Sequence, residues 1–301
     1  LSAAIPMYFG RKLGAPCVVS IHGTYIGHLS TLLNAPFRYW TAGDIATQLL
    51  EYPVKEFFSK LFRNASDHFI VCSVSTLHEF RACYSEVPLD KFTVIYNGVD
   101  LKTIEGLEDQ KSMDERNANH SLVYYGRLFW NKGILYLIKS FDILRRTIPD
   151  ASLDIYGGGP MESTIRRLIS KLGLQEAVRL KGVIPRQDLM ARLKNYAVVV
   201  FPSLYEAQPV AALEAMALRK PLVMFDAPYS REFIENMSNG VLARAWDIAD
   251  LSRKIEMILT DRSLAQRLGE TARKYVEQNH NWDCLAEKYI DVYEALVAEP
   301  S

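Results

Sequence analysis

The stretch VVVFPSLYEAQPVAALEAMA, residues 198–217, contains the features that decide the fold. Its first four residues are valines and a phenylalanine, which predict a short buried strand. A loop with two prolines follows, and the remaining residues from Val210 onward are mostly good helix formers. A buried strand that leads through a short loop into a helix is the repeating unit of a parallel α/β sheet.

The same alternation continues outward from this stretch in both directions. We expect one series of strands early in the chain and a second series after residue 119. Helices with apolar residues at helical spacing are expected at 134–144, 161–172, 251–259 and about 282–297. The expected strands are 17–21, 68–72 and 92–96 in the first series, and 122–125, 153–156, 178–180, 198–201 and 222–225 in the second.

Residues 105–119 form a polar stretch with almost nothing that could join a core, which predicts an interdomain linker. We therefore expect a Rossmann-like domain at 1–104 and a second one at 120–280. The helix in 281–301 is expected to pack back on the first domain. A complete doubly wound half takes on the order of 150 residues, so we expect the first domain to be incomplete and the chain to be trimmed at its N-terminus.

The composition excludes several classes of protein. Lys plus Arg and Asp plus Glu both number 35, and the resulting net charge of zero argues against a nucleic-acid binder. The four cysteines have no metal-ligand spacing, so reduced cysteines in a cytoplasmic protein are the simplest interpretation. No apolar run approaches the ~20 residues that span a bilayer.

The first candidate site is GRLFWNKG, residues 126–133, directly after an expected strand. Arg127 and Lys132 flank a loop that opens a helix. A guanidinium, an ammonium and a helix N-terminus together favour a diphosphate. The alternative is two solvated basic residues on a surface loop.

Two weaker motifs also follow expected strands. In YGGGP, residues 156–160, Gly157 allows the backbone to approach a ligand, although a plain strand-to-helix turn is favoured on this motif alone. In IHGT, residues 21–24, His22 is placed to donate a hydrogen bond to a sugar or phosphate. Without other support, His22 is better interpreted as a structural histidine.

The most informative motif is the pair Glu206 and Glu214, eight residues apart. Pro209 suits the first turn of the helix and leaves the amides of Val210 and Ala211 free to face an anion. Glu214 lies in an apolar segment, where an unpaired carboxylate is costly, and a ribose diol would serve as its partner. Eight residues of helix span at most ~12 Å, similar to the reach from a ribose across two phosphates to a sugar. The alternative is that Glu214 lies on the solvated side of the helix.

Together these motifs resemble the retaining glycosyltransferases of family 4, which have the GT-B architecture. Asn97-Gly98-Val99-Asp100 also matches the pattern at the end of that family's first domain. The resemblance implies an α/β fold of two Rossmann-like domains whose parallel sheets face each other across a cleft. It also implies polysaccharide or glycolipid synthesis with a nucleotide-sugar donor.

The resemblance implies a role for each motif residue. Arg127 and Lys132 would hold the donor diphosphate, Glu214 the ribose, Glu206 the transferred sugar, and His22 the sugar from the first domain. No metal and no cofactor are implied. The expected catalytic residues are His22, Glu206, Arg127 and Lys132, and the expected donor-binding residues are Gly126, Arg127, Lys132, Gly157, Val183, Ile184, Glu206, Ala207, Val210 and Glu214. Val183 and Ile184 would hold the base through backbone groups.

One departure from the family concerns the turn after Glu206. Many members have Gly-Phe-Gly there, whereas this chain has Ala207-Gln208-Pro209, and Pro209 removes one amide that could face the ligand.

We expect transfer of a hexose from a nucleoside diphosphate sugar to a hydroxyl of a glycan or lipid-linked acceptor, with retention of configuration. The alternatives are a nucleotide-sugar epimerase or hydrolase, and a non-catalytic nucleotide-sugar-binding remnant. Residues 51–63 (EYPVKEFFSKLFR) would suit an interfacial helix at the inner face of the cell membrane. We favour an ordinary packed helix there.

Overall fold

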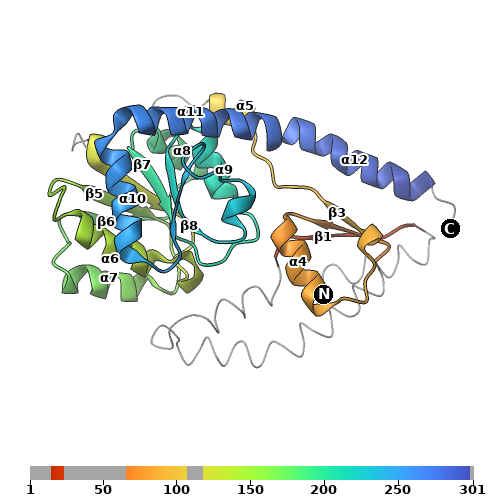
Figure 1. Cartoon of the computed structure of the whole chain (residues 1–301), viewed down its shortest axis with the longest axis horizontal. Helices are drawn as coiled ribbons and strands as arrows, with labels where there is room; N and C mark the ends of the chain where they lie inside the picture. Colours follow the sequence, from red (N-terminus) through yellow and green to blue (C-terminus); the bar gives the residue numbers. More distant parts are fainter. Residues whose placement is uncertain (1–14, 24–65, 107–117, 299–301) are drawn as a thin grey trace. The chain divides into compact units, whose positions relative to one another are not determined.

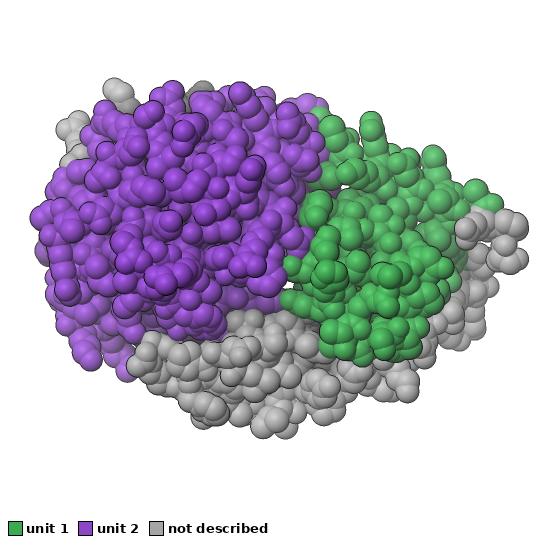
Figure 2. Space-filling model, in the orientation of Figure 1, with its two compact units in different colours: residues 1–96, 283–301 green, residues 97–282 purple. Residues whose placement is uncertain are grey.

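The computed structural model describes residues 15–23, 66–106 and 118–298, and the chain divides into two compact units. Figure 2 shows the unit of residues 97–282 in purple and the unit of residues 1–96 and 283–301 in green. The second unit begins before the predicted linker because Leu101 and Ile104 of helix α5 (Leu101–Glu105) belong to its core. Residues 107–117 of that linker and the segment 51–63 lie outside the described residues.

The first unit contains a parallel sheet of three strands in the order β1-β2-β3. Successive residues of a strand point to opposite faces, so Phe69 packs with Phe80 while Ile70 packs with Leu285 of the C-terminal helix. The described elements of this unit are β1 (Val18–Ile21), β2 (His68–Val71), α4 (Val74–Cys83), the short turn η2 (Leu89–Lys91), β3 (Phe92–Val94) and α12 (Trp282–Ala298).

The second unit contains a parallel sheet of six strands in the order β6-β5-β4-β7-β8-β9. Figure 1 labels β5, β6, β7 and β8 of this sheet. The predicted α/β class with parallel sheets in two units is confirmed. Strand β9 was not among the predicted strands. The bounds are β4 (Ser121–Tyr125), β5 (Ser152–Tyr156), β6 (Val178–Gly182), β7 (Val198–Phe201), β8 (Leu222–Asp226) and β9 (Val241–Arg244).

Helices pack in groups around this sheet. Helix α6 contacts α7 and α10, and α9 contacts α11. Among the described helices, none is both long and apolar enough to cross a membrane. The helices are α6 (Ile134–Leu144), α7 (Glu162–Lys171), α8 (Arg186–Leu193), α9 (Val210–Ala217), α10 (Ile248–Thr260) and α11 (Arg262–Asn279), with short turns η3 (Ala118–His120), η4 (Trp130–Lys132) and η5 (Ser230–Glu232).

The sheet has a switch point between β4 and β7. From β4 the chain adds β5 and then β6 on one side, and it then returns to place β7 on the other side of β4. Open α/β sheets bind ligands in the crevice at the carboxyl ends of strands where the order reverses. A ligand site is therefore expected in the loops that follow β4 and β7.

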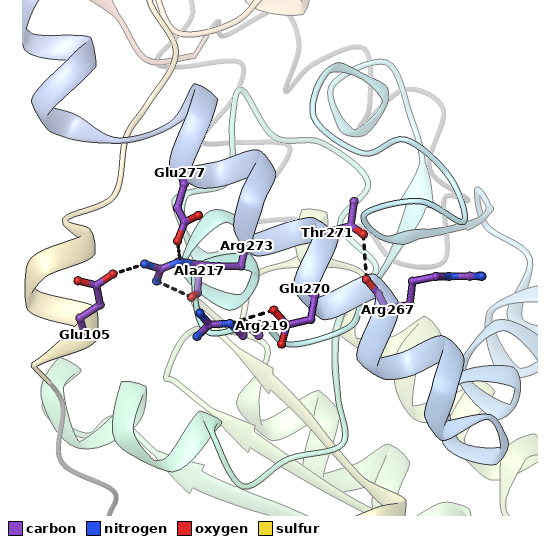
Figure 3. Close-up of polar contacts among 8 residues, drawn as sticks. All are labelled: Glu105, Ala217, Arg219, Arg267, Glu270, Thr271, Arg273 and Glu277. Atoms are coloured by element: carbon purple, nitrogen blue, oxygen red, sulfur yellow. Dashed lines mark hydrogen bonds and ion pairs between the residues drawn. The ribbon is translucent and has the colours of Figure 1, made fainter.

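The carboxyl end of α9 is held by a buried arginine of α11. Figure 3 shows Arg273 between Ala217, Glu105 and Glu277. Its Nη1 donates to the carbonyl oxygen of Ala217 at 2.9 Å, its Nε pairs with Glu277 at 2.5 Å, and its Nη2 pairs with Glu105. The Arg273 side chain is only 5% exposed. One guanidinium thus fixes the last residue of α9 against both α11 and α5.

The other end of α9 is held by Asn97, which lies four residues before α5. The amide of Asn97 donates to Oε1 of Gln208, and Nδ2 of Asn97 donates to the carbonyl oxygen of Gln208 at 3.2 Å. His280 makes a hydrogen bond of 2.9 Å from Nδ1 to the carbonyl oxygen of Asn97. Residues 97–106 therefore touch the chain on both sides of α9.

Replacing Arg273 by Met should lower the free energy of unfolding by about 1–3 kcal/mol, because the buried carbonyl oxygen of Ala217 loses its donor. Chemical denaturation followed by circular dichroism measures the change. Arg267→Met, on the same helix, is the control, since Arg267 is exposed and, among the described residues, its guanidinium makes no hydrogen bond or ion pair; Thr271 contacts its carbonyl oxygen. An equal effect of the two substitutions would contradict the role given to Arg273.

Candidate functional site

The loops that follow β4 and β7 interlock at the switch point. Gly133 has a φ of 67°, and a Cβ atom there would lie 1.8 Å from the carbonyl oxygen of Pro202. The buried Asn131 accepts a hydrogen bond from the amide of Leu204 at 2.7 Å and donates one to the carbonyl oxygen of Tyr205 at 3.3 Å. The two loops are therefore held together through backbone groups.

This interlock brings two predicted catalytic residues together. The Nζ atom of Lys132 lies 2.5 Å from Oε1 of Glu206, and the two side chains are 23% and 14% exposed. Mutual neutralisation makes the partial burial of both charges tolerable. The pair therefore places a cation beside a carboxylate in the two loops at the switch point.

Arg127 is placed differently from Lys132. The Arg127 side chain is exposed, and its guanidinium lies 5.5 Å from the centre of the Phe129 ring. The Arg127 carbonyl oxygen accepts a hydrogen bond from the Tyr124 hydroxyl at 3.0 Å. Among the described residues, no hydrogen bond or ion pair engages the guanidinium, which leaves it available to an anion. The described contacts do not join it to Glu206 or Glu214.

The loops after β4, β5 and β6 pack backbone against backbone. Gly157 has a φ of 131°, and a Cβ there would lie 1.9 Å from the carbonyl oxygen of Gly126. The amide of Gly157 donates to the carbonyl oxygen of Gly182 at 2.8 Å, and that of Leu128 donates to Gly158 at 3.0 Å. The structure thus brings the predicted residues Gly126 and Gly157 into contact.

Helix α9 begins one residue later than predicted. Pro209 is the N-cap, not a residue of the first turn, because its ψ of 104° is extended. Its carbonyl oxygen accepts hydrogen bonds from Ala212 and Leu213. In the described structure the amides of Val210 and Ala211 have no hydrogen-bond partner, so the positive end of the helix presents two donors.

Glu214 is buried, at 7% exposure, so its predicted solvated alternative is wrong. Its partner in the structure is Arg186, the first residue of α8, whose Nε and Nη2 atoms lie 2.9 Å and 2.5 Å from Oε1. The neighbouring Tyr125 hydroxyl donates to the carbonyl oxygen of Ala211 at 2.6 Å. Burial raises the pKa of Tyr125 well above its usual range, which keeps it a neutral donor.

The prediction missed Arg186. The cost of burying Glu214 signalled that a partner was required. The sequence does not show which loop would supply that partner.

The remaining predicted residues lie after other strands. Val183 and Ile184 follow β6, and Val183 is 81% exposed. Ala207 is partly buried between Glu206 and α9. His22 is exposed after β1 and belongs to the first unit.

A cavity of about 560 Å³ lies beyond β8 and β9, and its lining includes Asp226, Arg231, Arg244 and Asp250. None of these is a predicted site residue. Arg231 pairs with Asp226 at 2.5 Å, and the amide of Arg244 donates to Asp250 at 2.7 Å. Asp250 also lies 2.9 Å from Nη2 of Arg253 and 3.8 Å from Nε of Arg244, so both acidic side chains of this lining have cationic partners within the chain.

Two family models match the chain. Residues 107–275 match the glycosyl transferases of group 1, and residues 1–103 match glycosyltransferase family 4. The chain is 29% identical to an uncharacterized glycosyltransferase of Methanocaldococcus jannaschii, over 92% of this chain and 69% of that protein. It is 30% identical to a glycogen synthase of Mycobacterium tuberculosis, over 92% of this chain and 63% of that protein.

Among solved structures, an Anabaena protein in complex with UDP and glucose has the same fold. The TM-score is 0.75 at 18% identity, over 97% of this chain and 74% of that one.

Replacing Gly157 by Ala should lower the free energy of unfolding by about 2 kcal/mol or more, since the new methyl group meets a backbone oxygen and the residue has a left-handed φ. Gly158→Ala is the control, because a methyl group there meets only the Val183 side chain, at 3.3 Å. Thermal or urea unfolding compares them. A Gly157→Ala protein as stable as Gly158→Ala would show that the close approach is not real.

Proposed function

The chain belongs to the glycosyl transferases of group 1, and from this membership we propose that it moves a sugar from a nucleoside diphosphate sugar to a hydroxyl acceptor, with retention of configuration. The observation that supports the proposal most directly is the pairing of two acidic residues with two cations around α9. Glu206, which precedes the helix, pairs with Lys132, and Glu214, which lies within the helix, pairs with Arg186 of α8. This arrangement suits a ligand that carries a diphosphate and a ribose.

The leaving diphosphate would be stabilised by this chain's own positive groups. Departure of the nucleotide builds negative charge on the phosphate oxygens, and preorganised cations and amides lower the barrier to that step. Lys132, the unengaged guanidinium of Arg127, and the free amides of Val210 and Ala211 are the groups available. These groups make a mechanism without a metal ion workable.

The remaining proposed contacts are those with the ribose, the base and the sugar of the donor. Glu214 would accept from the ribose, and backbone groups of Val183 and Ile184 would hold the base. Glu206 would lie against the transferred sugar, with His22 contacting the sugar from the first unit. We assign no covalent nucleophile, and we propose that the leaving phosphate takes the proton of the acceptor on the same face of the sugar.

The acceptor in this proposal is a glycan or a lipid-linked glycan. Transfer to a lipid-linked acceptor would take place at the inner face of the cell membrane, and the protein would otherwise be cytoplasmic. The solved Anabaena structure contains UDP and glucose, which makes UDP-sugars the first donors to test.

A thermal-shift screen against UDP-, GDP- and ADP-sugars should identify the donor. A ligand at 100 times its dissociation constant stabilises the folded state by about 2.7 kcal/mol, enough to raise the melting temperature by several degrees. A shift with one base and none with the others is the expected result. No shift with any of the three would contradict the proposed donor class.

Replacing Arg127 by Ala should lower kcat/KM for transfer by about 10²–10³-fold and leave the melting temperature unchanged. Arg166→Ala is the control, because Arg166 is an exposed residue of α7 whose only ion pair among the described residues is with Glu162. Product analysis by mass spectrometry follows the reaction. Near-normal turnover of Arg127→Ala would contradict the mechanism. Epimerised or hydrolysed donor without consumption of acceptor would point to an epimerase or hydrolase, and binding without any product would point to a non-catalytic protein.

A further inference from the structure

The contact between Arg186 and Glu214 has an uneven geometry. Both guanidinium atoms, Nε and Nη2, bond to the same oxygen, Oε1, at 2.9 Å and 2.5 Å. Among the described residues, none donates a hydrogen bond to the other oxygen, Oε2. The carboxylate therefore keeps one oxygen committed to Arg186 and one oxygen free to accept.

Arg186 supplies the charge that Glu214 needs. The Glu214 side chain is 9% exposed and lies in a helix whose other buried residues are Ala, Leu and Met. An unpaired charge in such surroundings is costly. Tyr125, which is packed nearby, donates to the carbonyl oxygen of Ala211 and does not serve the carboxylate. Arg186 is thus the cationic partner that offsets the cost of burying the Glu214 carboxylate.

Arg186 also lies at the right place in the chain to connect two parts of a nucleotide site. It begins α8 directly after residues 183–185, and Val183 in that segment is 81% exposed. The Arg186 side chain is itself 53% exposed, so it extends from solvent to the buried carboxylate. The segment expected to hold the base and the residue expected to hold the ribose are therefore joined by one ion pair.

We propose that Arg186 is a positioning residue for ribose recognition, which fixes Oε1 of Glu214 and leaves Oε2 as the acceptor for a ribose hydroxyl. This inference rests on the proposed function. Its consequence is that discrimination between ribose and deoxyribose depends on Arg186, although Arg186 acts on the sugar only through Glu214.

The test uses UDP, GDP and ADP together with their 2′-deoxy forms, and measures dissociation constants by calorimetry. The wild-type protein should bind the ribonucleotide of its preferred base about tenfold more tightly than the 2′-deoxy form, the value of one hydrogen bond to a charged group. In Arg186→Met this ratio should fall to near 1, with the affinity for the 2′-deoxy form changed by less than about threefold. Glu214→Gln should lower the ratio in the same way.

Two further variants keep the test decisive if Arg186→Met is unstable. Arg186→Lys keeps a cation without the fork of two donors, and should retain part of the discrimination. The double variant Arg186→Met with Glu214→Gln removes the unpaired charge and should discriminate no less than either single variant, because the two residues act on one contact. Arg166→Met, a surface arginine, is the matched control and should keep the wild-type ratio.

The outcomes separate the two proposals. If the wild-type protein binds none of the six nucleotides, the proposed function fails and this inference fails with it. If the wild-type protein discriminates and Arg186→Met keeps the full ratio, only the role of Arg186 is overturned. An equal loss of affinity for both forms in Arg186→Met would instead make Arg186 a direct partner of the phosphates, and would also overturn this inference.

Discussion

The interlock between the loops after β4 and β7 is the constraint on which the candidate site depends. Gly133 accepts the close approach of the Pro202 carbonyl, and Asn131 bonds to both Leu204 and Tyr205. These contacts are made by backbone groups and one buried amide, so they leave the charged side chains free for chemistry. These contacts hold together the loops that carry Lys132 and Glu206, whose side chains pair at 2.5 Å.

The electrostatics of the site follow from an apolar helix that carries a carboxylate. Helix α9 is short and buried, and Glu214 would be too costly within it without a cation. A nucleotide ligand brings its own negative charge, so the site needs more positive groups than its two carboxylates neutralise. Arg127 and the amides at the start of α9 meet that need, because among the described residues none of these groups has a hydrogen-bond or ion-pair partner.

Sequence reasoning located the strands and the four loops because buried strands carry dense apolar runs and each loop follows such a run. It missed β9, whose short apolar run Val-Leu-Ala ends at Arg244, and α11, whose sequence is largely polar. It also did not show that α5 packs in the core of the second unit, since the apolar Leu101 and Ile104 are few among polar neighbours. Arg186 was missed because a pairing between residues 28 positions apart depends on how two loops meet, which local patterns do not encode.

Residues 97–106 are fastened to the chain at both ends of α9, through Gln208 before the helix and through Arg273 at Ala217 after it. An α-helix is stiff along its axis, and α9 lies between these two attachment points. Residues 97–106 therefore tie the loop that carries Glu206 to the far end of the helix that carries Glu214. A change in the spacing between the two carboxylates would have to break at least one of these contacts.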